Sequence, residues 1–240
     1  MNVSELRLQE FSRAVSHDLG SAIRGVDQLT AMLEQDLSAR LSDKERYWMS
    51  LIRSSAERAQ GMIDALTVYT RLSTQPPKPC TLNLAELVRN TVESCLIQHQ
   101  ASLDDIFKPN IQMDLQQIQV VSIVEHWSLM IRELIKNALE FQPDTDSQSH
   151  KIHIQLYTND DTGEGVLIIE DNGVGVTKEK IEQIATPFVT TRSPQDLDHF
   201  GMGLSYCARI AQINDALLQF THSDLGGLKV KYQFSLRATL

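Results

Sequence analysis

The chain has 240 residues, 42% of them hydrophobic, and its 22 basic and 31 acidic side chains give a net charge of −9. This acidic balance argues against binding to nucleic acid, because phosphate backbones select for clustered lysine and arginine. No apolar run approaches the roughly 20 residues of a membrane-spanning helix. The three cysteines, Cys80, Cys95 and Cys207, lack metal-ligand spacing and are typical of a reduced cytosolic protein. We therefore expect a cytoplasmic protein without a membrane segment, large enough for two domains.

Proline, glycine and charge divide the chain at the same place. All seven prolines lie at or after Pro76, and the first three form a cluster that predicts a stiff linker over residues 76–81. Eight of the eleven glycines lie between positions 163 and 227. Residues 1–75 carry nine basic and ten acidic side chains, so nearly all of the net charge falls on the remainder. We predict a helical domain over 1–75 and a second domain over 82–240.

The first domain has the pattern of a helical hairpin. Apolar residues recur every three or four positions between residues 5 and 39, which predicts one face of a long helix. A second stripe runs from Trp48 to Tyr69, and Ser42 with Glu45 supplies an N-cap signal in front of it. Two helices cannot enclose stripes of this length, so a second copy is expected to complete a four-helix bundle. The sequence therefore predicts a homodimer.

Helical and strand patterns are mixed in the second domain. Helices are predicted over residues 85–100, 125–141 and 204–214, and strands over 111–115, 119–124, 151–158, 166–170, 217–221 and 230–236. Because these helices and strands do not strictly alternate, we expect an α+β sandwich in which helices cover one face of a sheet.

One histidine of the first helix lies away from the apolar stripe. His17 is two residues from its apolar neighbours on either side, so helical geometry turns it roughly 200° from them. Asp18 is adjacent, and Ser21 lies one turn further along the same face. An exposed imidazole beside a carboxylate can act as a nucleophile toward a group brought by another domain. From these residues alone, a solvated helix face is the simpler interpretation.

Two glycine-containing strings follow predicted elements of the second domain. D-N-G-V-G at 171–175 ends a strand, where glycines allow the backbone to approach a planar ring or a phosphate, although a plain β-turn fits equally well. G-M-G-L at 201–204 precedes a helix whose free amides and dipole suit phosphate oxygens. The intervening stretch, which contains P-F-V-T-T-R at 187–192, is typical of a mobile flap.

The order of these pieces is more specific than any one of them. The hairpin contains S-H-D-L at 16–19, and it is followed by E-L-I-K-N-A at 133–138, D-N-G-V-G, P-F-V-T-T-R and G-M-G-L. In this order the chain resembles the transmitter core of two-component sensor histidine kinases over nearly its whole length. The resemblance implies a dimerisation and histidine-phosphotransfer hairpin, followed by an α/β-sandwich ATP-binding domain of the GHKL type.

The resemblance also implies roles for residues of the hairpin. His17 would accept the γ-phosphoryl group of ATP, and Asp18 would hydrogen-bond the ring and raise its nucleophilicity. The usual acceptor of the phosphoryl group in this family is an aspartate of a response-regulator receiver domain. Ser21 stands where the family orients water to dephosphorylate the regulator, so a phosphatase activity is compatible with the retained hydroxyl.

A nucleotide site follows from the same resemblance, with ATP and Mg²⁺ as the cofactors. Asn137 would bind Mg²⁺, and Glu133 would support the metal or its waters. Asp171 would accept the exocyclic amine of adenine. The residues that would admit the ring or form the lid and the phosphate cradle are Gly173, Gly175, Thr190, Thr191, Arg192, Gly201, Gly203 and Leu204.

Three positions depart from the family pattern. Ala22 replaces a proline, so the first helix should lack the usual kink. Glu140 stands where a basic residue usually faces the phosphates, a change for which Lys136 or Arg192 would compensate, and His199 replaces a glycine. Glu140 and His199 favour an alternative, a phosphotransfer or docking protein with a degenerate nucleotide domain. A chaperone-type or mismatch-repair-type ATPase is a third interpretation, but it leaves the hairpin unexplained.

The predicted hairpin and nucleotide domain together take up all 240 positions. We therefore expect a soluble stand-alone kinase whose input comes from a separate sensor protein, with a piece trimmed from a longer protein as the alternative.

Overall fold

The computed structural model describes residues 3–38, 40–74, 77–102, 109–141, 150–190 and 200–236. It divides into two compact units. The first consists of Met1–Gln75 and Phe188–Met202, and the second of Pro76–Pro187 and Gly203–Leu240. Among the residues that the structure describes, no helix is both long and apolar enough to cross a bilayer.

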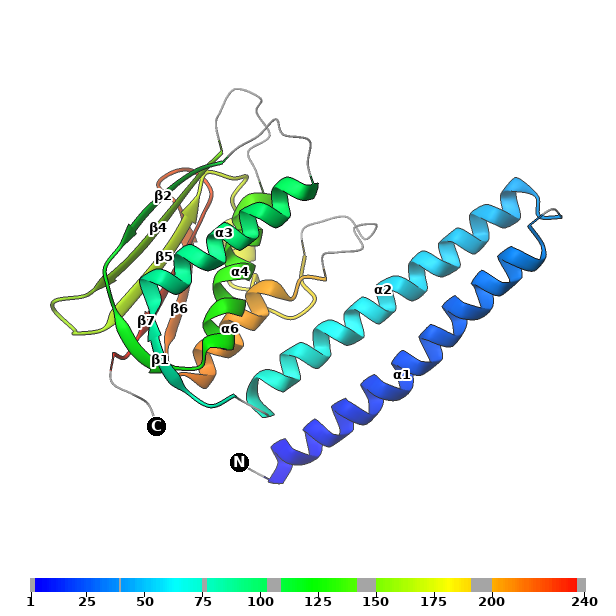
Figure 1. The fold of residues 1–240 in the computed structure, drawn as a ribbon, viewed down its shortest axis with the longest axis horizontal. Coiled ribbons are helices and arrows are strands. Elements are labelled where there is room, and N and C mark those ends of the chain that lie inside the picture. The colour runs from blue at the N-terminus through cyan, green and yellow to red at the C-terminus, as the bar shows by residue number, and fades with distance from the viewer. Residues whose placement is uncertain are drawn as a thin grey trace. The chain divides into compact units, whose positions relative to one another are not determined.

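The first unit contains the predicted helical hairpin, formed by α1 (Val3–Asp36) and α2 (Asp43–Thr74) (Figure 1). The N-cap predicted at Ser42 is present: its backbone N–H donates to Glu45 Oε2 at 2.8 Å, and the Glu45 N–H donates back to Ser42 Oγ at 3.4 Å. This reciprocal pair satisfies free donors at the helix start, which explains why α2 begins at Asp43. The first helix is continuous through Ala22.

Few of the described apolar side chains of the hairpin are buried. From Ser16 to Thr74, the buried apolar side chains among those that the structure describes are Met49, Ala56, Ala65 and Leu72. Its exposed large apolar side chains are Leu19, Val26, Leu29, Met32, Leu33, Tyr47, Trp48, Leu51, Ile52, Met62 and Val68. An exposed apolar surface of this extent marks an interaction site in a water-soluble protein.

The second unit contains a five-stranded mixed sheet in the order β2-β4-β5-β7-β6. The strands are β2 (Asn110–Leu115), β4 (Lys151–Thr158), β5 (Gly165–Asp171), β6 (Leu217–His222) and β7 (Leu228–Phe234). Strands β2 and β4 are parallel, and the other neighbouring pairs are antiparallel. A separate two-stranded ribbon pairs β1 (Cys80–Asn83) with β3 (Gln119–Ser122).

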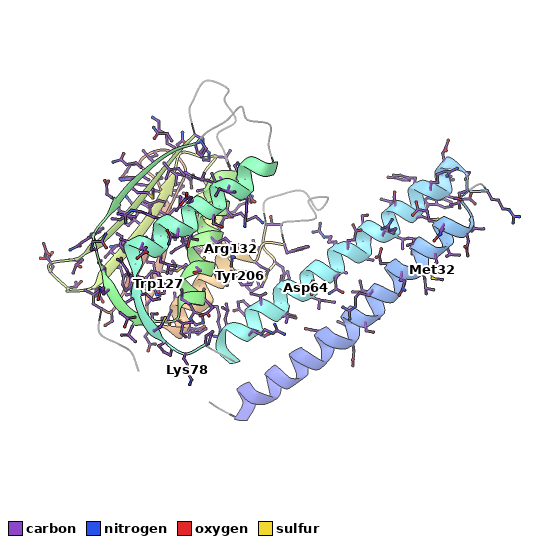
Figure 2. The ribbon with its side chains drawn as sticks, viewed as in Figure 1. Met32, Asp64, Lys78, Trp127, Arg132 and Tyr206 are labelled. Carbon is purple, nitrogen blue, oxygen red and sulfur yellow. The ribbon has the colours of Figure 1, made fainter. Side chains whose placement is uncertain are left out.

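Three helices cover one face of this sheet: α3 (Leu84–Ser102), α4 (Val124–Glu140) and α6 (Gly203–Ile213) (Figure 1). The buried residues of α4 recur every three or four positions, and Ile152, Ile154 and Leu156 alternate along β4 as residues on one face of a strand do. Trp127 of α4 (Figure 2) packs edge-on against Phe234 of β7, with ring centroids 4.8 Å apart. The core therefore lies between the helices and the sheet.

This arrangement confirms the predicted α+β sandwich, and every helix and strand predicted for this domain is present. Two short elements were not predicted, β1 and α5 (Lys178–Ile181). Strand β1 has four residues that follow the proline cluster in the sequence, and it includes Cys80 and Thr81, which were predicted to belong to the linker. The helix α5 is one turn long, too short for periodicity to identify.

Candidate functional site

The site is centred on Asp171, the last residue of the central strand β5. Its side chain is buried, and its Oδ1 accepts hydrogen bonds from the backbone N–H groups of Gly173 at 2.8 Å and Leu228 at 3.2 Å. Among the described residues, no donor is bonded to Oδ2. Burial raises the pKa of this carboxyl to about 6, against the two backbone hydrogen bonds, which lower it. The carboxylate is thus fixed by one oxygen and offers the other to a ligand.

Two glycines allow the backbone to crowd around this carboxylate. A Cβ atom at Gly173 would overlap the carbonyl oxygen of Phe141, and a Cβ atom at Gly227 would overlap the carboxylate oxygen of Asp171. Gly175, the other glycine of the predicted string, has a φ of +66° and lies beside the carbonyl oxygen of Gly226. Any side chain at Gly173 or Gly227 would therefore displace the carboxylate or its surroundings.

One face of α4, in the same unit as Asp171, carries several polar side chains. Glu133, Lys136, Asn137 and Glu140 follow one another at helical spacing, so they share that face. Lys136 Nζ lies 3.7 Å from Glu140 Oε1. Lys136, one of the two residues expected to compensate for the acidic Glu140, thus forms an ion pair with it within the helix.

The N-terminus of α6 lies next to this face. A Cβ atom at Gly203 would lie 2.8 Å from Glu133 Oε2, so the first turn of α6 lies beside the polar face of α4. Helix N-termini carry free N–H groups and the positive end of the helix dipole, which suit phosphate oxygens. Leu204, the next predicted residue, is buried and anchors this first turn in the core.

The flap is described only at its ends. Thr190 is exposed, and Gly201 has a φ of +66°, with the carbonyl oxygen of Val189 in the place that a Cβ atom would take. Thr191, Arg192 and His199 lie outside the described residues.

The predicted phosphoacceptor face belongs to the hairpin. His17 lies in α1, and its side chain is outside the described residues. Asp18 and Ser21 are both exposed, as expected for a helix face turned away from the hairpin partner.

The turn between β6 and β7 is a part of the site that was not predicted from the sequence. The Gly227 N–H donates to the backbone oxygen of Asp171 at 3.1 Å, and the next residue donates to its side chain. The consecutive glycines 226 and 227 between two predicted strands were the available signal, but they indicate a turn and not what the turn contacts. Glu170, which precedes Asp171, was missed as well.

Part of the chain matches a known protein family, and most of it is similar to parts of known sensor proteins. Residues 123–238 match the family described as histidine kinase-, DNA gyrase B-, and HSP90-like ATPase. Sensor protein QseC of Escherichia coli (strain K12) is 26% identical over 239 residues, which cover 94% of this chain and 47% of QseC. Phytochrome-like protein Cph1 of Synechocystis sp. is 24% identical over 212 residues, which cover 87% of this chain and 26% of Cph1. The chain thus spans about half the length of QseC and about a quarter of Cph1.

Solved structures show a shared fold. Full-length ShkA in complex with AMPPNP has a TM-score of 0.65 at 17% identity, covering 94% of this chain and 45% of ShkA. The Acinetobacter baumannii histidine kinase AdeS has a TM-score of 0.57 at 14% identity, covering 89% of this chain and 95% of the AdeS chain.

Proposed function

We propose that the chain is an ATP-dependent protein-histidine kinase. In support, residues 123–238 match the family described as histidine kinase-, DNA gyrase B-, and HSP90-like ATPase, and nearly the whole chain is similar to part of the sensor protein QseC. Residues 1–75 then serve as the phosphotransfer hairpin, 76–81 as the linker and 82–240 as the catalytic domain. His17 accepts the phosphoryl group and passes it to an aspartate of a response-regulator receiver domain.

The observation that carries this proposal is the buried carboxylate of Asp171. An ionised carboxylate with one oxygen held by backbone N–H groups is a strong acceptor for the exocyclic amine of adenine. The glycines at 173 and 175 admit the ring, and the start of α6 receives the phosphates. The sequence resemblance assigns further roles in phosphate binding to Thr190, Thr191, Arg192 and Gly201.

The oxygen donors of α4 fit Mg²⁺. Within the described residues no group of three His, Cys, Asp or Glu side chains could hold a metal. Mg²⁺ is commonly bound by one or two protein oxygens together with substrate phosphates, and it neutralises charge that develops on them. Asn137 would supply the amide oxygen, and Glu133 would hold a water of the metal.

Phosphoryl transfer requires mainly positioning and charge neutralisation. The neutral imidazole of His17 attacks the γ-phosphorus, a P–N bond forms as the bond to the bridging oxygen breaks, and ADP leaves. Asp18 accepts a hydrogen bond from the other ring N–H and stabilises the positive charge that develops on the ring.

Purified protein incubated with γ-labelled ATP and Mg²⁺ tests the proposal. We expect acid-labile, base-stable label on the protein. An unlabelled protein that accepts a phosphoryl group at His17 from a phosphorylated receiver domain would instead support the phosphotransfer alternative, which the acidic Glu140 favours.

Ser21 is exposed one turn from His17, and it supports the additional proposal of a phosphatase activity toward the regulator. Loss of phosphate from a labelled receiver domain measures this activity.

The exposed apolar face of the hairpin supports the proposed homodimer, with the same face of a second copy as its partner. We expect wild-type protein to elute with twice the chain mass of 27.1 kDa in light-scattering chromatography. Ile52→Glu should shift the protein to the monomer mass, because a buried unpaired carboxylate opposes association. Gln28→Glu adds the same charge at an exposed polar position of α1 and should leave the dimer intact. A dimeric Ile52→Glu variant would contradict this interface.

Nucleotide affinity is expected to depend on pH through Asp171. Its pKa of about 6 means that the carboxylate is ionised at pH 7.5 and mostly protonated at pH 5. A hydrogen bond to an ionised acceptor is about twice as strong as one to a neutral acceptor, so ADP should bind roughly tenfold more weakly at pH 5. Calorimetric titration across this range measures the effect, and adenosine, which lacks phosphates, separates it from phosphate protonation. An adenosine affinity that does not change with pH would contradict this role of Asp171.

A further inference from the structure

The turn between β6 and β7 forms a wall of the candidate nucleotide site. The N–H groups of Gly227, in the turn, and of Leu228, the first residue of β7, donate hydrogen bonds to Asp171 at 3.1 Å and 3.2 Å. A Cβ atom at Gly227 would overlap the Asp171 carboxylate, so the turn backbone is in close contact with it. The position of this turn therefore determines the position of the carboxylate oxygen that faces the turn.

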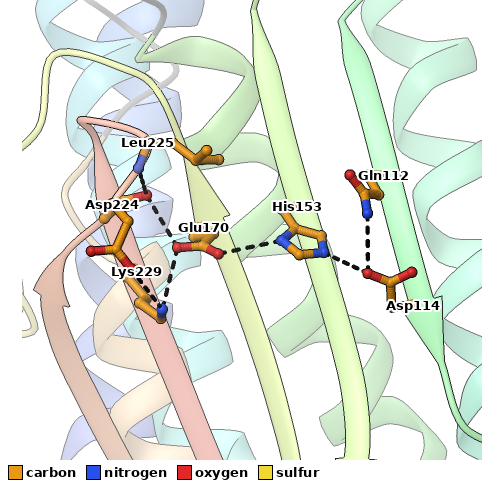
Figure 3. A network of polar contacts seen from close by, with 8 residues as sticks. Gln112, Asp114, His153, Glu170, Asp224, Leu225 and Lys229 are labelled. Carbon is orange, nitrogen blue, oxygen red and sulfur yellow. Dashed lines mark hydrogen bonds and ion pairs between the residues drawn. The ribbon is translucent and has the colours of Figure 1, made fainter.

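The side chain of Glu170 holds this turn from the other face of the sheet (Figure 3). Ser223 Oγ donates to Glu170 Oε2 at 3.2 Å and accepts from the Leu225 N–H at 3.0 Å. Lys229 Nζ lies 3.4 Å from the same Glu170 oxygen and 3.7 Å from Asp224 Oδ2. Glu170 is therefore bonded to the first residue of the turn and to the strand that follows it.

The other oxygen of Glu170 faces a histidine of the neighbouring strand. His153 Nδ1 lies 3.4 Å from Glu170 Oε1, and His153 Nε2 lies 2.8 Å from Asp114 Oδ2. Gln112 also donates to Asp114, at 3.2 Å (Figure 3). The charged groups around Glu170 thus come from β2, β4, β7 and the turn. The Glu170 side chain is 8% exposed, and a buried carboxylate persists only where such partners compensate its desolvation.

Glu170 cannot contact a nucleotide bound at Asp171. Successive residues of a strand point to opposite faces, so Asp171 points toward the helices while Glu170 points toward the face opposite them. Any effect of Glu170 on binding must therefore pass through the turn or through its charge.

We propose that Glu170 is a positioning residue for the nucleotide, because it holds the β6–β7 turn against Asp171 through Ser223 and Lys229. This inference rests on the proposed role of Asp171 in binding adenine.

The position of Glu170 next to Asp171 has a second, electrostatic effect. The negative charge of Glu170 contributes to the raised pKa of Asp171, although burial is the main cause. Removing that charge should lower the pH at which Asp171 titrates.

Three variants test the proposal by calorimetric titration with ADP across pH 5–8. Ser223→Ala loses one hydrogen bond but keeps the charge, so the affinity should fall roughly fivefold with an unchanged pH midpoint. Glu170→Gln should weaken binding and move the midpoint to lower pH. Asp224→Asn removes a charge from the same turn at a side chain that is 97% exposed, so it should match wild type.

For Glu170→Gln, the lowered midpoint shows that the charge of Glu170 acts on Asp171, whereas a general loss of stability would reduce affinity without moving the midpoint. Glu170→Gln and Ser223→Ala variants that both match Asp224→Asn, while wild type binds ADP, would overturn the inference alone. A wild-type protein that does not bind ADP would instead overturn the proposed function. His153 faces the same carboxylate, so His153→Gln is included. A midpoint that moves equally in His153→Gln and in Glu170→Gln would assign the titration to the imidazole and would also overturn the inference.

Discussion

His17→Gln is expected to abolish acid-labile labelling of the protein by γ-labelled ATP. Glutamine has a polar side chain of similar size but no nucleophilic ring nitrogen, so the phosphoryl group has no acceptor. Loss of a nucleophile reduces the rates of enzymes by factors on the order of 10³ or more. Quantified label on the gel-separated protein measures the effect, and it should fall to background.

The same variant should bind ADP with wild-type affinity, because His17 belongs to the hairpin, whereas Asp171 and the polar face of α4 belong to the other unit. Gln28→Ala, at an exposed polar position of the same helix, is the matched control and should label normally. Label that persists on His17→Gln would identify a different acceptor and would contradict the assignment of His17.

Asp171→Asn should weaken ADP binding by about 10- to 100-fold. A hydrogen bond to a charged group contributes about 1.5 to 3 kcal/mol, and each 1.4 kcal/mol is a tenfold change in affinity. The asparagine either presents its amide hydrogens to the adenine amine or turns them toward the backbone donors of Gly173 and Leu228. In either orientation, an N–H group of the asparagine faces another N–H donor, so a hydrogen bond is lost.

Asp224→Asn makes the same chemical change at an exposed side chain and is the control for this experiment. Far-ultraviolet circular dichroism verifies that both variants are folded. An Asp171→Asn protein that binds ADP within twofold of wild type would show that adenine is recognised elsewhere, and the proposed geometry of the site would have to be abandoned.

Local sequence patterns predicted most of the fold because the patterns themselves are local. The hairpin follows from apolar periodicity, and the start of α2 follows from Ser42 and Glu45, which are three residues apart. Strand β1 escaped prediction because it is a strand only by virtue of its pairing with β3, whose partner residues lie some 40 positions away, as in Cys80 with Ser122. Pairings of this kind are not visible in a window of a few residues.

Some residues of the candidate site could also be predicted from local sequence patterns, and others could not. Asp171, Gly173 and Asn137 belong to strings whose order is recognisable, so they could be named from the sequence. Glu170 and Ser223 could not, because their contact depends on β7 lying between β5 and β6 in the sheet. The roles of all the candidate site residues stay predictions, including those of Asp171, Asn137 and His17.

The opposite orientations of Glu170 and Asp171 also bear on communication within the catalytic domain. The peptide unit between Glu170 and Asp171 joins the polar network around Glu170, on the sheet face opposite the three helices, to the carboxylate of the nucleotide site. A change in that network could therefore reach Asp171 without a rearrangement of the packed core. Any molecule that bound Asp114 or His153 and displaced Glu170 would thereby change nucleotide affinity. By thermodynamic reciprocity, the nucleotide would change the affinity for that molecule by the same factor.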